Sequence, residues 1–278
     1  MSKIKWSEEK ILQWQAEGRG KGTGANYQPW LKVTDFSSRG NSRRVFSQKT
    51  GRAHHFFSDV EWHLFLLLEH ANDIIDIREQ YPLDREDTIA IATRLGIRHP
   101  TDPETRVSTV MTCDILVTRQ VGQDRILEAF NCKRLEEAEN TRSIEKLEIQ
   151  HSYFNGCDIA HRLIFHTMLP MVKVKNIEWM RNAHIISRDE IEPYEGYYRD
   201  HCERMMCELA RDPQDVSVSE FSENYDTRHG VITGTGLRAI RMLLSQGIIV
   251  ANLNELSIAG APVSRLHPTG KNLQKVGG

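Results

Sequence analysis

The chain has 278 residues, of which 39% are hydrophobic and 27% are charged, and its formal net charge is −2. This composition is typical of a globular protein with one large domain or two smaller ones. No apolar run reaches the 18 residues that would cross a membrane, and the amino end, Met-Ser-Lys-Ile-Lys-Trp, is too charged to begin a signal peptide. We therefore expect a cytoplasmic protein with no membrane partner. The five cysteines form no Cys-x-x-Cys pair, which argues against structural zinc and against a disulfide framework.

Positive charge is concentrated at the amino-terminal end. Residues 1–57 contain 11 Lys and Arg against four acidic residues, a net charge of +7, so that residues 58–278 carry −9. Such a segment is typical of an arm that faces phosphate, although a solvated charged surface would have the same composition. The candidate DNA contacts in this arm are Arg19, Lys21, Arg43, Arg44, Lys49 and Arg52.

Three local patterns divide this basic arm. Residues 10–15 predict a short helix, and residues 18–24 form a glycine-rich loop. This loop lacks the pattern Gly-x-x-x-x-Gly-Lys-Ser/Thr and no strand precedes it, so we reject nucleotide binding there. Residues 43–48 and 52–57 predict a β-hairpin that turns at Lys49-Thr-Gly51.

A helix is predicted to begin at Ser58 and to end near Ala71. Ser58 and Glu61 have the spacing of a capping box, directly before the apolar run of residues 62–68. The capping box explains Glu61 without a catalytic role. The same spacing places Glu61 in the first helical turn, near the sheet if the helix packs on it, and the two interpretations are compatible.

The next segments predict a strand and a helix. Residues 74–77 are apolar and begin a strand that Pro82 should close. Gln80 could reach a functional site from this strand or simply bond to backbone. Residues 84–106 predict a helix followed by a proline-rich loop.

The most informative stretch is a second hairpin. Residues 112–118 and 126–133 predict two strands joined by a polar turn that contains one glycine. Because side chains alternate along a strand, Asn131 and Lys133 share one face and Cys132 points to the other. If Asp114 faces the same way, the set can hold a divalent cation and activate water at a phosphodiester. Alone the pattern is weak, because Asp and Lys on paired strands are more often solvated surface residues.

A helix and a strand follow the hairpin. Residues 135–153 predict the helix, on which Glu145 and Glu148 are either surface charges or approach the candidate metal site. Residues 161–166 predict the strand. The order helix, strand, hairpin, helix, strand, with an acid on the first helix, is what we expect of a restriction-endonuclease-like α/β domain, here spanning residues 1–168.

Residues 169–278 predict a second, mostly α domain. Helices are expected at 197–209, 218–225 and 235–245, followed by a strand at 246–253 and a terminal hairpin that includes 263–266. This order is winged-helix-like. The third helix carries only Arg238 and Arg241, which is few for DNA recognition, so we expect this domain to bind a protein partner.

Several spaced blocks resemble the TnsA family, the endonuclease subunit of heteromeric bacterial transposases. In chain order the blocks are residues 58–61, residues 76–83, the Asp114 strand, Lys133 and residues 176–179. The resemblance is strongest over residues 8–180 and extends to the remainder by length and general pattern.

The resemblance implies a set of site residues. Glu61 and Asp114 would ligate Mg²⁺, for which Mn²⁺ could substitute, and Lys133 would be catalytic. The side chain of Asn131 and the backbone carbonyl of Cys132 would complete the metal ligands. Asn131 departs from the glutamate or glutamine of the family and is one methylene shorter, which leaves open whether one or two ions bind.

The resemblance also implies partners and a reaction. The chain would cut the 5′ strands at transposon ends, in a complex with a TnsB-like transposase subunit that cuts and joins the 3′ ends and with an ATP-dependent, TnsC-like regulator. Gln150 stands where the family has an acid, so a role for this position in binding a second metal is weak. Two alternatives remain: a stand-alone restriction or repair nuclease with the same site, and a non-catalytic scaffold that bridges DNA and the regulator.

Overall fold

The computed structural model describes residues 4–36, 41–137, 139–184, 192–211 and 215–271. By its internal contacts the chain divides into two compact units, residues 1–169 (unit 1) and 170–278 (unit 2), which are described separately. Within the described ranges, no helix is both long and apolar enough to cross a membrane.

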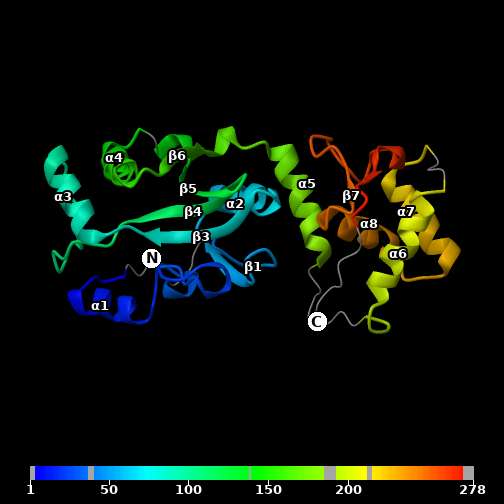
Figure 1. Ribbon diagram of the computed structural model, residues 1–278, viewed down its shortest axis with the longest axis horizontal. Helices are drawn as coiled ribbons and strands as arrows, with labels where there is room; N and C mark the ends of the chain where they lie inside the picture. Colours follow the sequence, from blue (N-terminus) through cyan, green and yellow to red (C-terminus); the bar gives the residue numbers. More distant parts are fainter. Residues whose placement is uncertain (1–3, 37–40, 138, 185–191, 212–214, 272–278) are drawn as a thin grey trace. The chain divides into compact units, whose positions relative to one another are not determined.

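Unit 1 is organised around a four-stranded mixed sheet (Figure 1). The spatial order is β3 (Ile74–Pro82), β4 (Thr112–Val121), β5 (Asp124–Lys133) and β6 (Ala160–Phe165). The first three strands are antiparallel, whereas β6 runs parallel to β5. A parallel neighbour requires a crossover connection, and the helix α4 (Thr141–Gly156) provides it.

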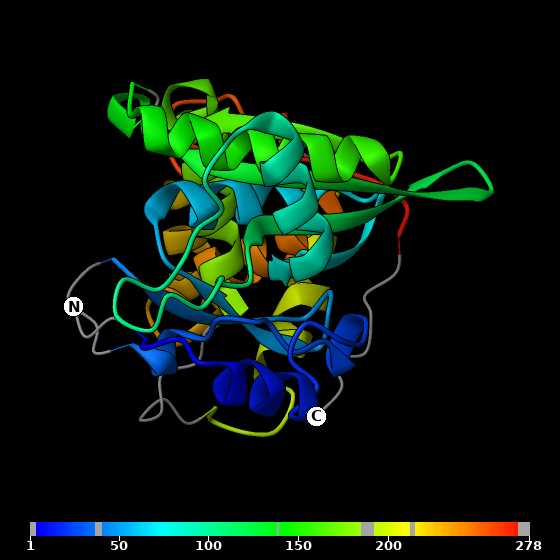
Figure 2. The ribbon, with the colours of Figure 1, turned by 90° about the vertical axis from the view of Figure 1, so that its left-hand side faces the viewer.

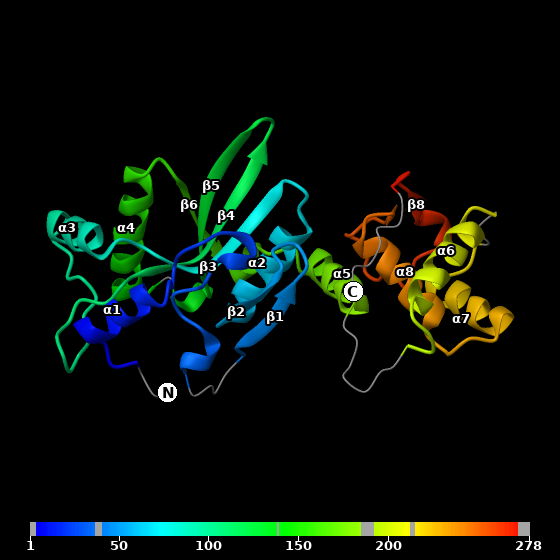
Figure 3. The ribbon, with the colours of Figure 1, turned by 60° about the horizontal axis from the view of Figure 1, so that its bottom comes forward.

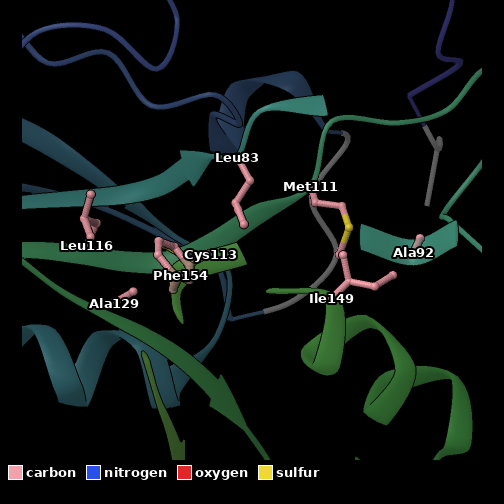
Figure 4. Close-up of a cluster of buried hydrophobic side chains, with 8 residues drawn as sticks. All are labelled: Leu83, Ala92, Met111, Cys113, Leu116, Ala129, Ile149 and Phe154. Carbon is pink, nitrogen blue, oxygen red and sulfur yellow. The ribbon is translucent and has the colours of Figure 1, made fainter. Parts of the chain in front are cut away.

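Three helices pack around this sheet. α2 (Asp59–His70) contacts β3 and β5, while α3 (Arg85–Leu95) contacts α4. The cluster of buried apolar side chains that joins α3 and α4 to the sheet is shown in Figure 4. Its members are Leu83, Ala92, Met111, Cys113, Leu116, Ala129, Ile149 and Phe154.

The hairpin of β4 and β5 is longer than the sequence predicts. Pairing continues through Arg119–Ile126 and Val121–Asp124, so the connecting turn is only Gly122 and Gln123, with Gly122 at a φ of +60°. The prediction took the polar residues between the two strands as the turn. In the structure these residues still pair through their backbones, where the hairpin extends beyond the core. Figure 2 shows this end of the hairpin projecting from unit 1.

The amino-terminal arm folds against β3. The predicted short helix is α1 (Glu8–Ala16), and the predicted hairpin is β1 (Arg43–Ser47) with β2 (Arg52–Phe56). Two short 3₁₀ helices, at 24–26 and 33–35, lie between them. The glycine-rich loop is a packing element, because a Cβ on Gly20, whose φ is +79°, would lie 2.2 Å from the Pro82 ring.

The predicted bounds of α2 are confirmed, whereas those of α4 are wrong at the start. Ser58 caps α2 and Ala71 ends it. α4 begins at Thr141 rather than 135, because the Asn140 side chain accepts a hydrogen bond from the Ser143 N–H and caps the helix. A 3₁₀ turn at 135–137 precedes this cap.

Unit 2 contains four helices in its described residues, with α8 (Thr235–Ser245) at its centre. α8 packs against α5 (Met171–Arg181), α6 (Tyr197–Leu209) and α7 (Val218–His229), as Figure 3 shows. The bounds of α6 and α8 agree with the prediction, α7 runs four residues further, and α5 was not predicted.

The strands of unit 2 are shorter than the sequence suggests. In the described residues of unit 2, the one ladder is formed by β7 (Ile249–Val250) and β8 (His267–Pro268), so the strand predicted over 246–253 is largely wrong. Residues 263–265 form a 3₁₀ turn instead of a strand. Ile248 and Ile249 are both buried although only Ile249 lies in the ladder, so hydropathy alone does not determine strand length.

Candidate functional site

Glu61 lies in the first turn of α2 with its side chain almost fully buried at 6% exposure. The Ser58 hydroxyl accepts a hydrogen bond from the Glu61 N–H (3.2 Å) and donates one to Glu61 Oε1 (2.8 Å). Glu61 Oε2 accepts the Phe57 N–H (3.0 Å). The predicted cap at Ser58 is therefore present. The second bond of the capping box, to the Glu61 carboxylate, comes from the N–H of Phe57, one residue before the cap.

The electrostatics of Glu61 show that three of the predicted site residues converge. Burial, followed by the charge of Asp114, raises the pKa of Glu61 to about 8. The Phe57 and Ser58 hydrogen bonds and the charge of Lys133 lower the pKa without offsetting the rise. The carboxyl groups of Glu61 and Asp114 and the ammonium group of Lys133 thus lie close enough to interact electrostatically. The positive charge that the protein supplies there does not balance the negative charge of the two acids.

Asp114 is tied to the neighbouring strand. Its Oδ2 accepts the backbone N–H of Cys132 at 2.6 Å, just beyond the Ile115–Phe130 pair at which the regular ladder ends. Burial, followed by the charges of Asp114 and Glu61, raises the pKa of the Cys132 thiol well above its usual range. The sulfur is therefore an uncharged thiol, and the carbonyl is the group of Cys132 that suits a hard cation.

Asn131 is buried at 3% exposure, and its amide points to a residue that the sequence did not single out. Its Oδ1 lies 2.6 Å from Nε2 of His161 on β6. Lys133, two residues further along β5, is half-buried and pairs with Phe165. The contact with His161 depends on the parallel register of β5 and β6, which no local sequence pattern reveals.

Two buried glutamines fix the start of β4, next to Asp114. The Thr112 hydroxyl donates to Gln80 Oε1 (3.1 Å), and Gln150 Nε2 donates to the Thr112 carbonyl (2.7 Å). Gln80 has a φ of +47°, a conformation that non-glycine residues rarely adopt and that occurs preferentially at functional sites. Gln80 and Gln150 therefore position the strand that carries Asp114.

The acids of α4 do not join this cluster. Glu145 forms an ion pair with Arg142 at 2.6 Å, and Glu148 is exposed. No group of three or more His, Cys, Asp or Glu side chains that could hold a metal ion occurs in the described part of the chain. A metal ion at Glu61 and Asp114 would therefore draw further ligands from amide or backbone oxygens.

Two of the candidate DNA contacts are held in internal ion pairs. The Arg19 side chain is 9% exposed, binds Asp35 (2.6 Å) and lies 3.8 Å from the centre of the Trp14 ring. Arg52 donates to both oxygens of Glu79, at 2.9 and 2.6 Å. Their guanidinium groups stabilise the arm and β2, and they do not form an open surface.

The remaining candidate DNA contacts differ in accessibility. Lys49 Nζ donates to the Leu68 carbonyl (3.4 Å) and to the Ala71 carbonyl at the end of α2, and burial lowers the pKa of Lys49. Arg43 is half-buried and bonds to Asp59 (3.0 Å), in the same helical turn as Glu61. Only two of the six candidates, Lys21 and Arg44, are classed as exposed.

A second buried acid, Glu79, was not predicted from the sequence. It is fully buried and binds Arg52, the His54 ring (2.7 Å to Nδ1) and the His55 N–H (3.1 Å). Burial alone would raise the pKa of Glu79, but His54 and Arg52 together lower it to about 2. The network joins β2 to β3, so its members become neighbours only in the tertiary structure.

Comparison with known proteins gives two family matches and a full-length relative. The model for "TnsA-like endonuclease N terminal" matches residues 71–166, and the model for "TnsA endonuclease C terminal" matches residues 169–253. The transposon Tn7 transposition protein TnsA of Escherichia coli is 32% identical over 254 residues, which cover 89% of this chain and 87% of that protein. The first match contains Asp114 and residues 131–133, whereas Glu61 lies ahead of it.

Proposed function

This chain belongs to the TnsA endonuclease family, and on that premise we propose that it is a metal-dependent DNA endonuclease that cuts the 5′ strands at transposon ends. It would act as one subunit of a cut-and-paste transposase in the bacterial cytoplasm. Unit 1, with its mixed sheet and crossover helix, would be the restriction-endonuclease-like catalytic domain.

The observation that carries this proposal is the convergence of Glu61, Asp114 and Lys133. A buried glutamate whose pKa is raised to about 8 beside a second acid is a site short of positive charge, and a divalent cation supplies it. Mg²⁺ or Mn²⁺ prefers oxygen ligands, which Glu61, Asp114, the Asn131 amide and the Cys132 carbonyl would provide, as one or two ions. When bound, such an ion lowers the pKa of a coordinated water and neutralises charge on the scissile phosphate.

The chain's own groups would prepare the site for this chemistry. The Phe57 and Cys132 N–H groups orient the carboxylates of Glu61 and Asp114. Lys133 would place positive charge near the phosphate or the attacking water, where it stabilises the developing negative charge. The two buried glutamines hold the start of β4 and keep Asp114 in register.

For DNA binding we propose a smaller set of residues than the sequence suggested. Lys21 and Arg44 are exposed and would contact phosphates, which position a nuclease without reading sequence. Arg43 would join them next to the site, since it is bonded to Asp59 on the first turn of α2. Arg19, Lys49 and Arg52 are left out of the set because their charges serve internal bonds.

Unit 2 would be a winged-helix-like domain that docks a protein, namely the TnsC-like regulator. Arg238 donates to the Ala183 carbonyl (3.0 Å) and Arg241 to the Trp179 carbonyl (2.8 Å). Both arginines of α8 are thus used within unit 2. This arrangement favours protein docking over insertion of α8 into a DNA groove.

The amino end of α8 supports the same conclusion. Asp226 accepts the N–H groups of Gly234 (2.6 Å) and Gly236 (2.7 Å). A helix amino end often receives a phosphate, but here an internal carboxylate occupies that position. The end of α8 is therefore already satisfied by unit 2 itself.

A strand-resolved cleavage assay on transposon-end DNA tests the proposal, with and without the partner transposase and ATPase, in Mg²⁺. We expect partner-dependent 5′ cuts that Asp114→Ala abolishes while complex assembly is retained. The control is Asp124→Ala, the same substitution at the exposed start of β5 in the same hairpin, which should cut like wild type.

Other outcomes would point to other functions. Cutting by the purified wild-type chain without partners would indicate a stand-alone nuclease. An assembled complex that never cuts the 5′ strands would indicate a scaffold. Loss of assembly and folding in Asp114→Ala would count against a purely catalytic role for this residue.

A further inference from the structure

His161 and Asn131 form a partly buried pair although 30 residues separate them in the chain. β6 runs parallel to β5 with His161 opposite Ala129, and residues two apart in a strand share a face. Asn131 and His161 therefore lie on the same face of the sheet. The 2.6 Å contact joins the ring Nε2 to the amide oxygen, which solvent barely reaches.

The direction of this hydrogen bond follows from the chemistry of its atoms. An amide oxygen only accepts, so Nε2 of His161 carries the hydrogen. This donation uses one lone pair of Asn131 Oδ1 and leaves the second lone pair for another partner.

The imidazole ring is itself held in place by α4. Its centre lies 5.2 Å from that of the Phe154 ring and 5.8 Å from that of the His151 ring. Phe154 is fully buried in the core cluster of unit 1. The orientation of the Asn131 amide is thus determined by the packing of α4 on the sheet.

Such support matters more for asparagine than for a longer or charged ligand. A neutral amide attracts a cation less strongly than a carboxylate does, and the Asn131 side chain is short. A side chain that is already held loses less conformational entropy when it binds. Groups that hydrogen-bond to a metal ligand commonly change metal affinity by about 10–100-fold.

We propose that His161 is a positioning residue, which holds the Asn131 amide in the orientation that lets its oxygen bind the metal ion. This inference rests on the metal-dependent function proposed above. It assigns to β6 and α4 a part in metal binding, although neither contributes a ligand.

Titration calorimetry of the full chain with Mn²⁺, without DNA, tests this role. His161→Leu should weaken Mn²⁺ binding about tenfold. His161→Gln should stay near wild type, because its amide N–H can take the place of the Nε2–H. His161→Asn, which is polar but too short to reach Asn131, should resemble His161→Leu and replaces it if the leucine variant does not fold.

A matched control separates this role from simple loss of a buried histidine. His99, also in unit 1, is 8% exposed and bonds to the Thr88 hydroxyl and the Pro100 carbonyl. His99→Leu should lower the melting temperature and leave Mn²⁺ affinity unchanged. If it weakens Mn²⁺ binding as much as His161→Leu does, the proposal is overturned.

A double-mutant cycle with Asn131→Ala identifies the route of the effect. If His161 acts through Asn131, then His161→Leu should cause no further loss of affinity in the Asn131→Ala chain. An equal loss in both backgrounds, or none in either, would overturn the proposal while the metal site stands. If wild type binds Mn²⁺ no better than Asp114→Ala, both the metal-dependent function and this inference fail.

Discussion

Two of the buried glutamates of unit 1 have opposite environments. Glu79 binds Arg52, His54 and the His55 N–H, and His54 and Arg52 lower its pKa to about 2 in spite of burial. Glu61 is about as inaccessible to solvent, yet burial and the neighbouring Asp114 raise its pKa to about 8. One acid is balanced by the protein and the other is not.

This difference separates a structural carboxylate from a candidate functional one. A balanced buried ion pair joins strands and gives no reason to expect a ligand. An unbalanced buried carboxylate costs stability, and such perturbed groups concentrate at functional sites. The two glutamates could not be distinguished by residue type, and only their partners separate them.

The largest expected effect is on stability at Glu79. Glu79→Gln removes the negative charge and leaves the Arg52 guanidinium buried without its ion pair, so we expect a loss of about 3–5 kcal/mol in the free energy of unfolding. Urea denaturation of unit 1 measures this loss. Glu61→Gln is the matched change and should not destabilise the chain at pH 8. Equal losses of stability at both positions would contradict the difference between a balanced Glu79 and an unbalanced Glu61.

Two arginines of the same hairpin provide the next test. Arg52→Met leaves Glu79 short of its main cation, and we expect a loss of roughly 3 kcal/mol in the free energy of unfolding. Arg44→Met, at an exposed position of β1, should leave stability unchanged. It should instead weaken DNA binding and reduce the slope of log affinity against log salt by about 1. Altered DNA affinity without altered stability in Arg52→Met would contradict this division.

The pH dependence of stability should differ in sign between the two acids. The folded-state pKa of Glu61 is raised to about 8 from 4.5, so its contribution to stability is fully present below 4.5 and is lost as the pH rises to about 8. The folded-state pKa of Glu79 is lowered to about 2, so its contribution is present above 4.5 and is lost as the pH falls toward 2.

Thermal melts measure the Glu61 effect. In EDTA, the melting temperature of wild type should fall between pH 6 and pH 9 more than that of Glu61→Gln. Mn²⁺ should raise the melting temperature of wild type most at the upper end of this range, where Glu61 is ionised. Identical pH profiles for the two chains would show that Glu61 is not the unbalanced group.

The smallest expected effect concerns Lys49, at the other end of the helix that carries Glu61. Lys49→Met removes the donor to the Leu68 and Ala71 carbonyls, and we expect a loss of about 1 kcal/mol in the free energy of unfolding, with Mn²⁺ affinity unchanged. Lys21→Met is the exposed control and should not alter stability. If Lys49→Met lowers DNA affinity, Lys49 is a DNA contact after all.

Local patterns in the sequence determined much of unit 1. The cap at Ser58 and the apolar run after it predicted α2 with its correct bounds, because both signals lie within a few residues of each other. Turn residues and alternation likewise predicted both hairpins. The two-residue period of a strand likewise predicted that Asn131 and Lys133 share a face, and it left open which way Asp114 points.

Only the tertiary structure decided which charges are balanced. The contacts from Glu79 to Arg52, from Gln150 to Thr112 and from His161 to Asn131 join residues 27, 38 and 30 positions apart. No local period relates such positions, since their approach depends on strand order and helix packing.

The basic arm also shows what the sequence alone does not determine. Its composition determined that 11 positive charges precede residue 58. It did not determine that Arg19 and Arg52 are held by Asp35 and Glu79, because an ion pair depends on where each partner lies after folding. The sequence by itself thus determined the kinds of groups and their local order, and the packing of the sheet decided which of these groups are neutralised by internal ion pairs.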